Sequence, residues 1–111
     1  MTEEIKIPVD IYESEDEIVI VLPLAGVPKD TIKIWLEKTT LYVSWDRKQP
    51  QLKETLKPVI SECFRWSFVR KIELPQNIYF DKITSVLTPE NVLIIVVPKI
   101  IIPEKLEIRL N

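Results

Sequence analysis

The chain has 111 residues, a net charge of −2, no histidine, one cysteine and one glycine. This length fits a single domain, and the missing residue types exclude Ser-His-Asp and Cys-His catalysis, most structural zinc sites and a glycine-rich phosphate loop. No spacing singles out a pair of carboxylates for glycoside hydrolysis, so we expect neither an enzyme nor a bound metal or cofactor.

The sequence also limits the partners and the cellular location. No basic stripe interleaved with aromatic residues is present, and no apolar run approaches the ~18 residues of a membrane span, so we expect no nucleic acid and no membrane partner. The acidic N-terminus lacks the apolar core of a signal peptide, and the lone Cys63 cannot form an internal disulfide. Both observations predict a cytoplasmic protein.

Abundant isoleucine and valine favour an all-β chain. Apolar stretches, most of them alternating and bounded by turn signals, predict strands at residues 9–12, 17–23, 31–37, 39–46, 62–74, 82–87 and 92–97. Gly26 is expected to need a positive φ, and Asn91 suits a left-handed turn. Seven or eight short strands with turns about every ten residues predict an immunoglobulin-like antiparallel β-sandwich.

The last predicted strand, residues 92–97, is aliphatic on both faces. Successive side chains of a strand point to opposite sides, so one face carries Leu93, Ile95 and Val97 and the other carries Val92, Ile94 and Val96. Because both faces are apolar, we expect both to be covered. The core of the sandwich covers one face of this strand. What covers the other face bears on function.

Three sequence motifs follow one another along these strands. Leu24-Ala25-Gly26-Val27 leads to Asp30-x-Ile32-Lys33-Ile34, Phe68-x-Arg70 leads to Leu74-Pro75, and Asn91-Val92-Leu93 leads to Pro98-Lys99. Together they resemble the α-crystallin domain of the small heat-shock proteins, although Trp66 and Asn91 stand where that family has glycine. The resemblance implies a short N-terminal arm over residues 1–7, a sandwich domain over 8–99 and a C-terminal tail over 100–111.

The resemblance implies an ATP-independent chaperone that holds partly unfolded client proteins. It also implies a homodimer that assembles into higher homo-oligomers. The alternative is a protein-interaction adaptor on the same sandwich fold, similar to the CS-domain co-chaperones. The short arm favours the adaptor, and the apolar tail favours the chaperone.

The tail of the family carries an Ile-x-Ile/Val pair that docks on a neighbouring subunit, and Ile108 and Leu110 stand at that place. Such a tail works by strand addition, in which alternate side chains fill pockets while the backbone pairs with a strand edge. Leu106 with Ile108, and the run 100–102, are alternative docking pairs. A tail that folds back on its own domain is the alternative to docking between subunits.

The receiving groove is expected between the strands at 31–37 and 92–97, with Ile34, Trp35, Ile94 and Val96 as groove and client surface. Trp35, Ile94 and Val96 are expected to form an unusually apolar outer surface, which marks a binding site or an oligomer contact. The alternative is that a local segment such as 100–102 covers this surface.

The irregular segment 47–61 resembles, by position, the loop that non-animal members of the family exchange to form a dimer. Leu52, Leu56 and Ile60 are its expected apolar anchors. Arg70 resembles a charged contact at the dimer interface, and an ordinary cross-strand ion pair is the alternative. The alternating residues Phe64, Trp66 and Phe68 are expected in the core.

Overall fold

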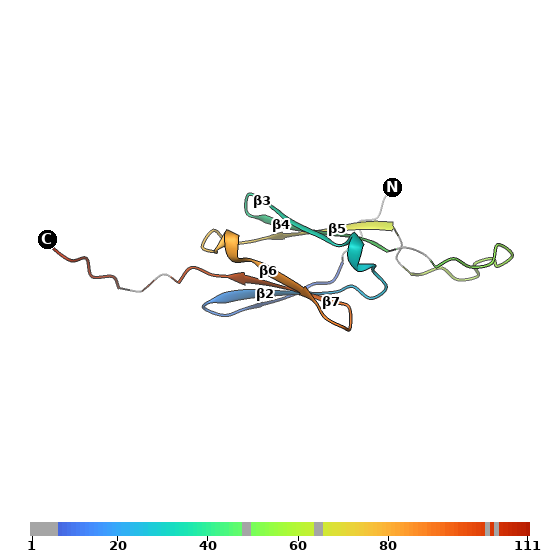
Figure 1. Ribbon diagram of the computed structural model, residues 1–111, viewed down its shortest axis with the longest axis horizontal. Coiled ribbons are helices and arrows are strands. Elements are labelled where there is room, and N and C mark those ends of the chain that lie inside the picture. Colours follow the sequence, from blue (N-terminus) through green and yellow to red (C-terminus); the bar gives the residue numbers. More distant parts are fainter. Residues whose placement is uncertain (1–6, 48–49, 64–65, 102, 104) are drawn as a thin grey trace.

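Two antiparallel sheets packed face to face form the protein (Figure 1). The computed structural model describes residues 7–47, 50–63, 66–101, 103 and 105–111. Within these residues the four-stranded sheet has the order β1-β2-β7-β6 and the three-stranded sheet has the order β3-β4-β5. Their bounds are β1 Asp10–Glu13, β2 Glu17–Pro23, β3 Lys33–Glu37, β4 Thr40–Arg47, β5 Trp66–Glu73, β6 Thr84–Leu87 and β7 Val92–Pro98.

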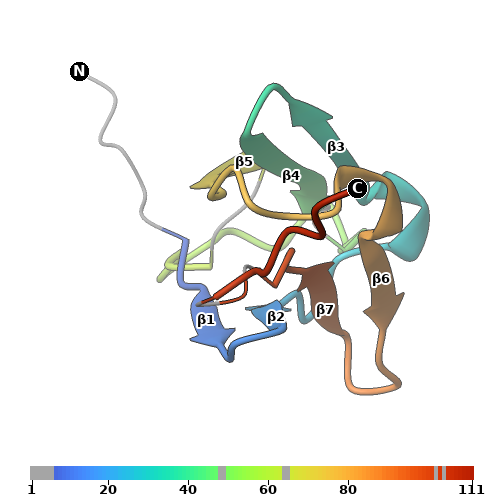
Figure 2. The same cartoon turned by 90° about the vertical axis from the view of Figure 1, so that its left-hand side faces the viewer.

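This architecture confirms the predicted all-β sandwich. The end-on view in Figure 2 shows the two sheets as separate layers, with β3 and β6 at one open side of the sandwich. Two short 3-10 helices, η1 Lys29–Thr31 and η2 Phe80–Lys82, lead into β3 and β6. The division into arm, domain and tail stays a prediction.

The core lies between the sheets and is built from alternate residues of each central strand. β7 contributes Leu93, Ile95 and Val97, each at most 3% exposed. The opposite sheet contributes Leu41, Val43, Trp45, Phe68 and Ile72. The Trp45 and Phe68 rings stack with their centroids 5.9 Å apart. Phe68 therefore lies in the core as expected, whereas Phe64 and the Trp66 side chain lie outside the described residues.

Three turns hold residues in the left-handed region of φ. Gly26 has a φ of +77° and Asn91 a φ of 63°, as the sequence predicts, whereas the φ of 56° at Lys38 in the β3–β4 hairpin has no counterpart among the predictions. Nothing lies within 4 Å of the position that a Cβ of Gly26 would occupy. The backbone conformation alone therefore favours glycine there.

The root of the tail is fixed to the sandwich on two sides. The Lys99 ammonium donates to Glu13 Oε1 at 2.6 Å and to the Ser14 carbonyl at 2.9 Å. The backbone N–H of Ile100 donates to the Asn77 carbonyl at 2.8 Å. The chain therefore leaves the domain in a direction set by these bonds, and the tail continues away from the end of β7 (Figure 1).

Candidate functional site

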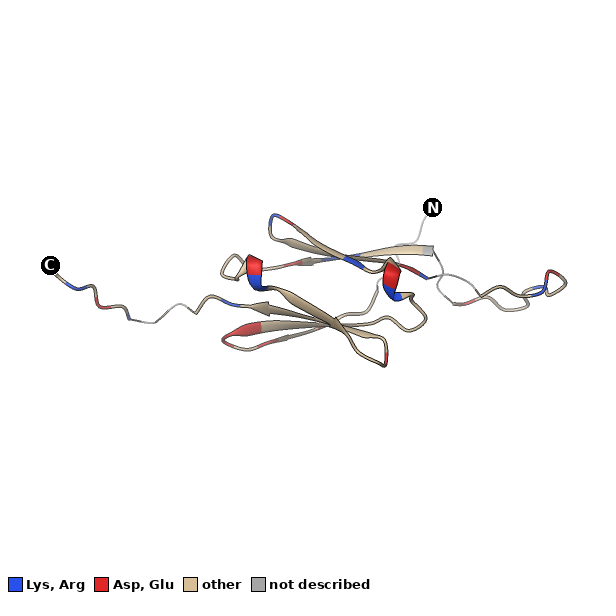
Figure 3. Ribbon diagram, in the orientation of Figure 1, with Lys and Arg blue, Asp and Glu red and all other residues tan. Residues whose placement is uncertain are grey.

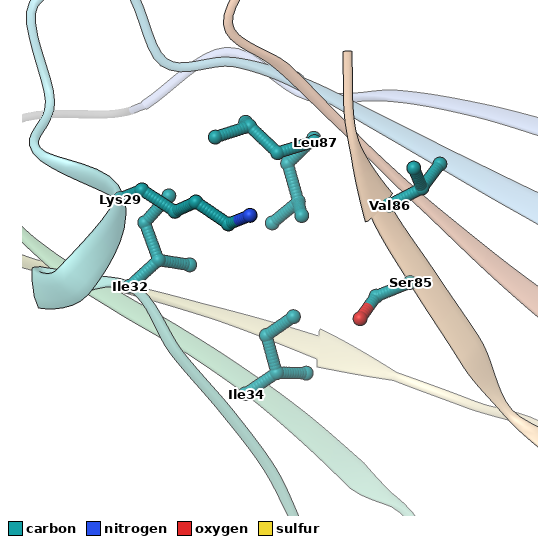
Figure 4. A pocket seen from close by; sticks show the side chains of 7 residues that line it. Lys29, Ile32, Ile34, Ser85, Val86 and Leu87 are labelled. Atoms are coloured by element: carbon teal, nitrogen blue, oxygen red, sulfur yellow. The ribbon is translucent and has the colours of Figure 1, made fainter.

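A groove runs between β3 and β6, which are the outermost strands of their two sheets in the described part of the chain. The first of its two hollows has a volume of about 310 Å³ and is lined by Lys29, Ile32, Ile34, Ser85, Val86, Leu87 and Leu93 (Figure 4). The second has a volume of about 240 Å³ and is lined by Ile34, Trp35, Leu36, Leu41, Ile83, Thr84 and Ser85. Ile34 and Ser85 line both, so the two hollows are neighbours.

The groove differs in one wall from the expected groove. Ile34 lines both hollows, and the second wall is β6 and not the strand at 92–97. β6 pairs along β7, with Val86 opposite Ile94 and Thr84 opposite Val96, so β7 is an interior strand of its sheet. Leu93 of β7 also lines the first hollow.

Trp35, Ile94 and Val96 do not form one surface, because they belong to the outer faces of different sheets. Trp35 lies opposite Tyr42, and the two rings stack with centroids 5.2 Å apart on the outer side of the three-stranded sheet. Ile94 and Val96 alternate with the buried Leu93, Ile95 and Val97, so they point away from the core on the other side of the molecule.

The outer face of the four-stranded sheet is nevertheless apolar over its two central strands. Its register places Val19 and Val21 of β2 beside Val96 and Ile94 of β7. The flanking strands add Tyr12, which is 60% exposed, and Val86, which is 58% exposed. We call these six residues the outer apolar face. An antiparallel sheet with a solvated face normally carries polar residues there.

The tail does not occupy the groove of its own molecule. Leu106, Ile108 and Leu110 are 74%, 87% and 96% exposed, so they make few contacts with the sandwich. The fold-back alternative is therefore absent from this conformation, in the described part of the tail. Of the alternative run 100–102, Ile102 lies outside the described residues and Ile101 is 66% exposed.

The connection between β4 and β5 projects from the end opposite to the tail (Figure 1). Residues 50–63 contain no strand, and the three predicted anchors Leu52, Leu56 and Ile60 are 63%, 60% and 77% exposed. These anchors share a loop hollow of about 460 Å³ with the prolines at 50 and 58. The loop therefore presents apolar side chains that its own domain does not cover.

Arg70 lies on β5 opposite Val43, on the side of the sheet that faces the core. Its Nε atom is buried and has no hydrogen-bond partner, and among the described residues no carboxylate forms an ion pair with it. The cross-strand ion pair that the sequence left open is therefore not present in the described structure. A buried N–H without an acceptor is costly.

Two parts of the groove are not among the predicted site residues: Lys29, which lines the first hollow, and the part of β6 that forms the second wall. The alternation of Ile32, Ile34 and Leu36 in the sequence indicates the wall that β3 forms. β6 is short and starts with Thr84 and Ser85, so its local sequence gives little indication of a binding edge.

Two other classes of site are absent from the described residues. They contain no group of three or more His, Cys, Asp or Glu side chains that could hold a metal ion. They also contain no helix that is long and apolar enough to cross a membrane. The apolar groove, the tail and the loop are therefore the features from which a function can be argued.

Comparisons with known proteins identify the family. The chain is 33% identical over 98 residues to a 17.3 kDa class II heat shock protein of Solanum peruvianum, and the match covers 87% of this chain and 63% of that protein. It is 32% identical over 99 residues to a 17.6 kDa class II heat shock protein of Arabidopsis thaliana, with the same coverage. The chain thus spans about 63% of the length of these curated relatives.

Among solved structures, a small heat-shock protein from Xylella fastidiosa superposes with a TM-score of 0.76 at 27% identity, covering 94% of each chain. Heat shock protein 16.0 from Schizosaccharomyces pombe superposes with a TM-score of 0.78, covering 97% of this chain and 100% of that one; at 22% identity this match shows the fold alone. The model of the Hsp20/alpha crystallin family matches residues 10–110, which is nearly the whole chain. The protein is therefore a member of the Hsp20/alpha crystallin family.

Proposed function

We propose that the protein is an ATP-independent chaperone that binds partly unfolded proteins on apolar surface and assembles by docking the tail of one copy in the β3–β6 groove of another. The observation that carries the proposal is the match between an exposed apolar tail and a pair of neighbouring hollows. Ile108 and Leu110 are two residues apart, and alternate residues of a strand point to the same side. One strand can therefore place one anchor in each hollow.

The free energy expected from docking one tail is small enough for the contact to be reversible. Burying Ile108 and Leu110 contributes roughly 1.5–3 kcal/mol each. Immobilising a separate chain costs about 4–15 kcal/mol. A single tail is too weak to hold a complex, but several tails acting together, or a tail added to a dimer contact, can do so. A groove that is vacated easily is also open to a client.

The dimer contact is assigned to the loop and to Arg70. Exchange of the loop between two copies would bury Leu52, Leu56 and Ile60, which the monomer leaves exposed. An acceptor from the second copy would satisfy the buried Nε of Arg70. The small heat-shock protein from Xylella fastidiosa has a distinct high order structure, which supports assembly of related chains.

Client binding is assigned to the groove around Ile34 and Trp35 and to the outer apolar face around Ile94 and Val96. Apolar surface of this kind attracts segments that an unfolding protein exposes. Names of the relatives connect this family to heat shock, where such segments appear. We place the protein in the cytoplasm, where a lone cysteine such as Cys63 stays reduced.

A thermal aggregation assay tests the proposal. A heat-labile enzyme that is unrelated to this chain is warmed with and without the protein, in the absence of ATP, and light scattering is followed. The proposed chaperone suppresses the scattering in proportion to its concentration, whereas an equal mass of a heat-stable protein does not. An adaptor of the CS-domain kind gives no suppression, and that result would exclude the chaperone function.

A further inference from the structure

Lys29 places a positive charge in the first hollow of the groove, whereas the described lining of the second hollow is uncharged. The side chain extends from η1 to the first hollow, where its nitrogen points into the space between the aliphatic side chains (Figure 4). The second hollow has no charged residue in its described lining. Lys29 has no ion-pair partner among the residues that the structure describes, and its neighbour Asp30 does not line either hollow.

The tail is asymmetric in charge as well. Its anchors are separated by Arg109, and Glu107 precedes Ile108. In an extended strand Glu107 and Arg109 point away from the side that carries the anchors, toward the mouth of the groove. The groove and the tail can therefore distinguish the two directions in which the tail could lie.

The order of the hollows along the strands is known from their lining. The chain runs from Ile32 in the first hollow through β3 to Leu36 in the second, and β6 runs in the opposite sense. η1 precedes β3, so Lys29 marks the outer end of the first hollow. Figure 3 shows that η1 and its charged residues lie where the connection enters β3.

Only one direction places an acidic side chain of the tail beside Lys29. With Ile108 in the first hollow and Leu110 in the second, Glu107 lies at the outer end, where the flexible Lys29 side chain can turn out of the hollow to meet it. Arg109 lies between the two hollows in either direction; with the direction reversed, Glu107 lies beyond the second hollow and the neutral Asn111 takes its place beside Lys29. An opposite charge beside Lys29 is available only in the first direction, so that direction is favoured.

We infer that Lys29 is a specificity-determining residue of the groove: it pairs with Glu107 of a second copy and so directs the tail parallel to β3 and antiparallel to β6, with Ile108 in the first hollow and Leu110 in the second. This inference rests on the proposed docking of the tail. It adds the direction and the register of the docked strand, and it excludes Leu106 with Ile108 as the pair that fills both hollows.

A double-mutant cycle on peptide binding tests the pairing. The full chain carries Ile108→Ser and Leu110→Ser, so that its own tail cannot compete. A fluorescent peptide of residues 103–111, acetylated and amidated so that no terminal charge contributes, is titrated by anisotropy. Lys29→Glu in the protein, or Glu107→Lys in the peptide, is expected to weaken binding about fivefold, which is the upper range for an exposed ion pair. Combining both changes restores the affinity to within about twofold.

Controls separate this inference from the docking itself. Lys53→Glu makes the same charge change in the β4–β5 connection and should leave peptide affinity unchanged. In about 1 M salt the effect of Lys29→Glu should vanish, because exposed charges are screened within roughly 3 Å, while the loss caused by an Ile108→Ser peptide persists.

The outcomes are distinguishable. If the Ile108→Ser peptide binds as well as the unchanged peptide, or if the unchanged peptide does not bind, tail docking is wrong and the inference with it. If docking depends on Ile108 but the two charge changes add without recovery, the direction assigned here is wrong. A free-acid peptide that binds better than the amidated one, without coupling to Glu107, indicates the reversed direction.

Discussion

Ile94 and Ile95 are neighbours in β7 with the same side chain and different surroundings. Ile95 is fully buried between the sheets, and Ile94 is half-buried on the outer apolar face. Ile95→Ala is expected to lower the free energy of unfolding by about 2–5 kcal/mol, because the removed atoms leave a cavity in the core. Ile94→Ala should cost about 1 kcal/mol or less. Urea denaturation measures both, and equal losses would contradict the assignment of the two faces.

Gly26 is the residue at which backbone conformation limits substitution. Its φ of +77° is unfavourable for a side chain, although no neighbour would collide with one. Gly26→Ala is therefore expected to lower the free energy of unfolding by about 1–2 kcal/mol. Gly26→Asn should lose less, because asparagine tolerates this region better. If alanine and asparagine are equally tolerated in thermal unfolding, the strain argument fails.

At the scale of elements, the outer apolar face can be altered without changing the sandwich. Replacing both Ile94 and Val96 by threonine keeps the β-branched shape and adds hydroxyls on a half-exposed surface. We expect weaker protection of a heated client or a smaller assembly, with an unchanged fold by circular dichroism. Unchanged protection together with unchanged light scattering would show that this face binds neither clients nor other copies.

The β4–β5 connection offers its own matched pair of variants. Leu52→Ser with Leu56→Ser removes two proposed anchors, whereas Val59→Ser changes a residue of the same loop that is 95% exposed. If the loop is exchanged between copies, the first variant should dissociate at a concentration at which the Val59 variant is still a dimer. Analytical ultracentrifugation gives the comparison. Equal dissociation of the two variants would count against the proposed anchors.

Strands in which apolar and exposed residues alternate regularly could be predicted from the sequence. The groove could not be located in full, because only one of its two walls was predicted. β2 covers the same residues, 17–23, as the prediction, because Ile18, Ile20 and Leu22 alternate with half-exposed valines. The sequence predicts β6 as a strand, but its position beside β7 depends on a pairing between distant parts of the chain. That pairing moves Ile94 and Val96 away from the groove. A left-handed lysine at position 38 has no local signal, because turn propensity favours glycine or asparagine there.

At the scale of the whole molecule, two apolar projections leave opposite ends of the sandwich. The described chain measures 82 × 35 × 20 Å, because the β4–β5 connection extends to one side and the tail to the other (Figure 1). A loop exchanged between two copies gives a closed, symmetric contact. A tail that enters the groove of another copy joins different surfaces, and such a contact can extend an assembly beyond the dimer. If both proposed contacts form, they would build a higher oligomer held by weak contacts.

Light scattering of the purified full chain, compared with the Ile108→Ser, Leu110→Ser variant, tests docking of the tail most directly. The unchanged chain is expected to have a mass above that of a dimer, and the double variant should fall to a dimer. Leu106→Ser serves as the matched control and should keep the larger mass. Equal masses for the unchanged chain and the double variant, or a monomer in both, would contradict assembly through the β3–β6 groove.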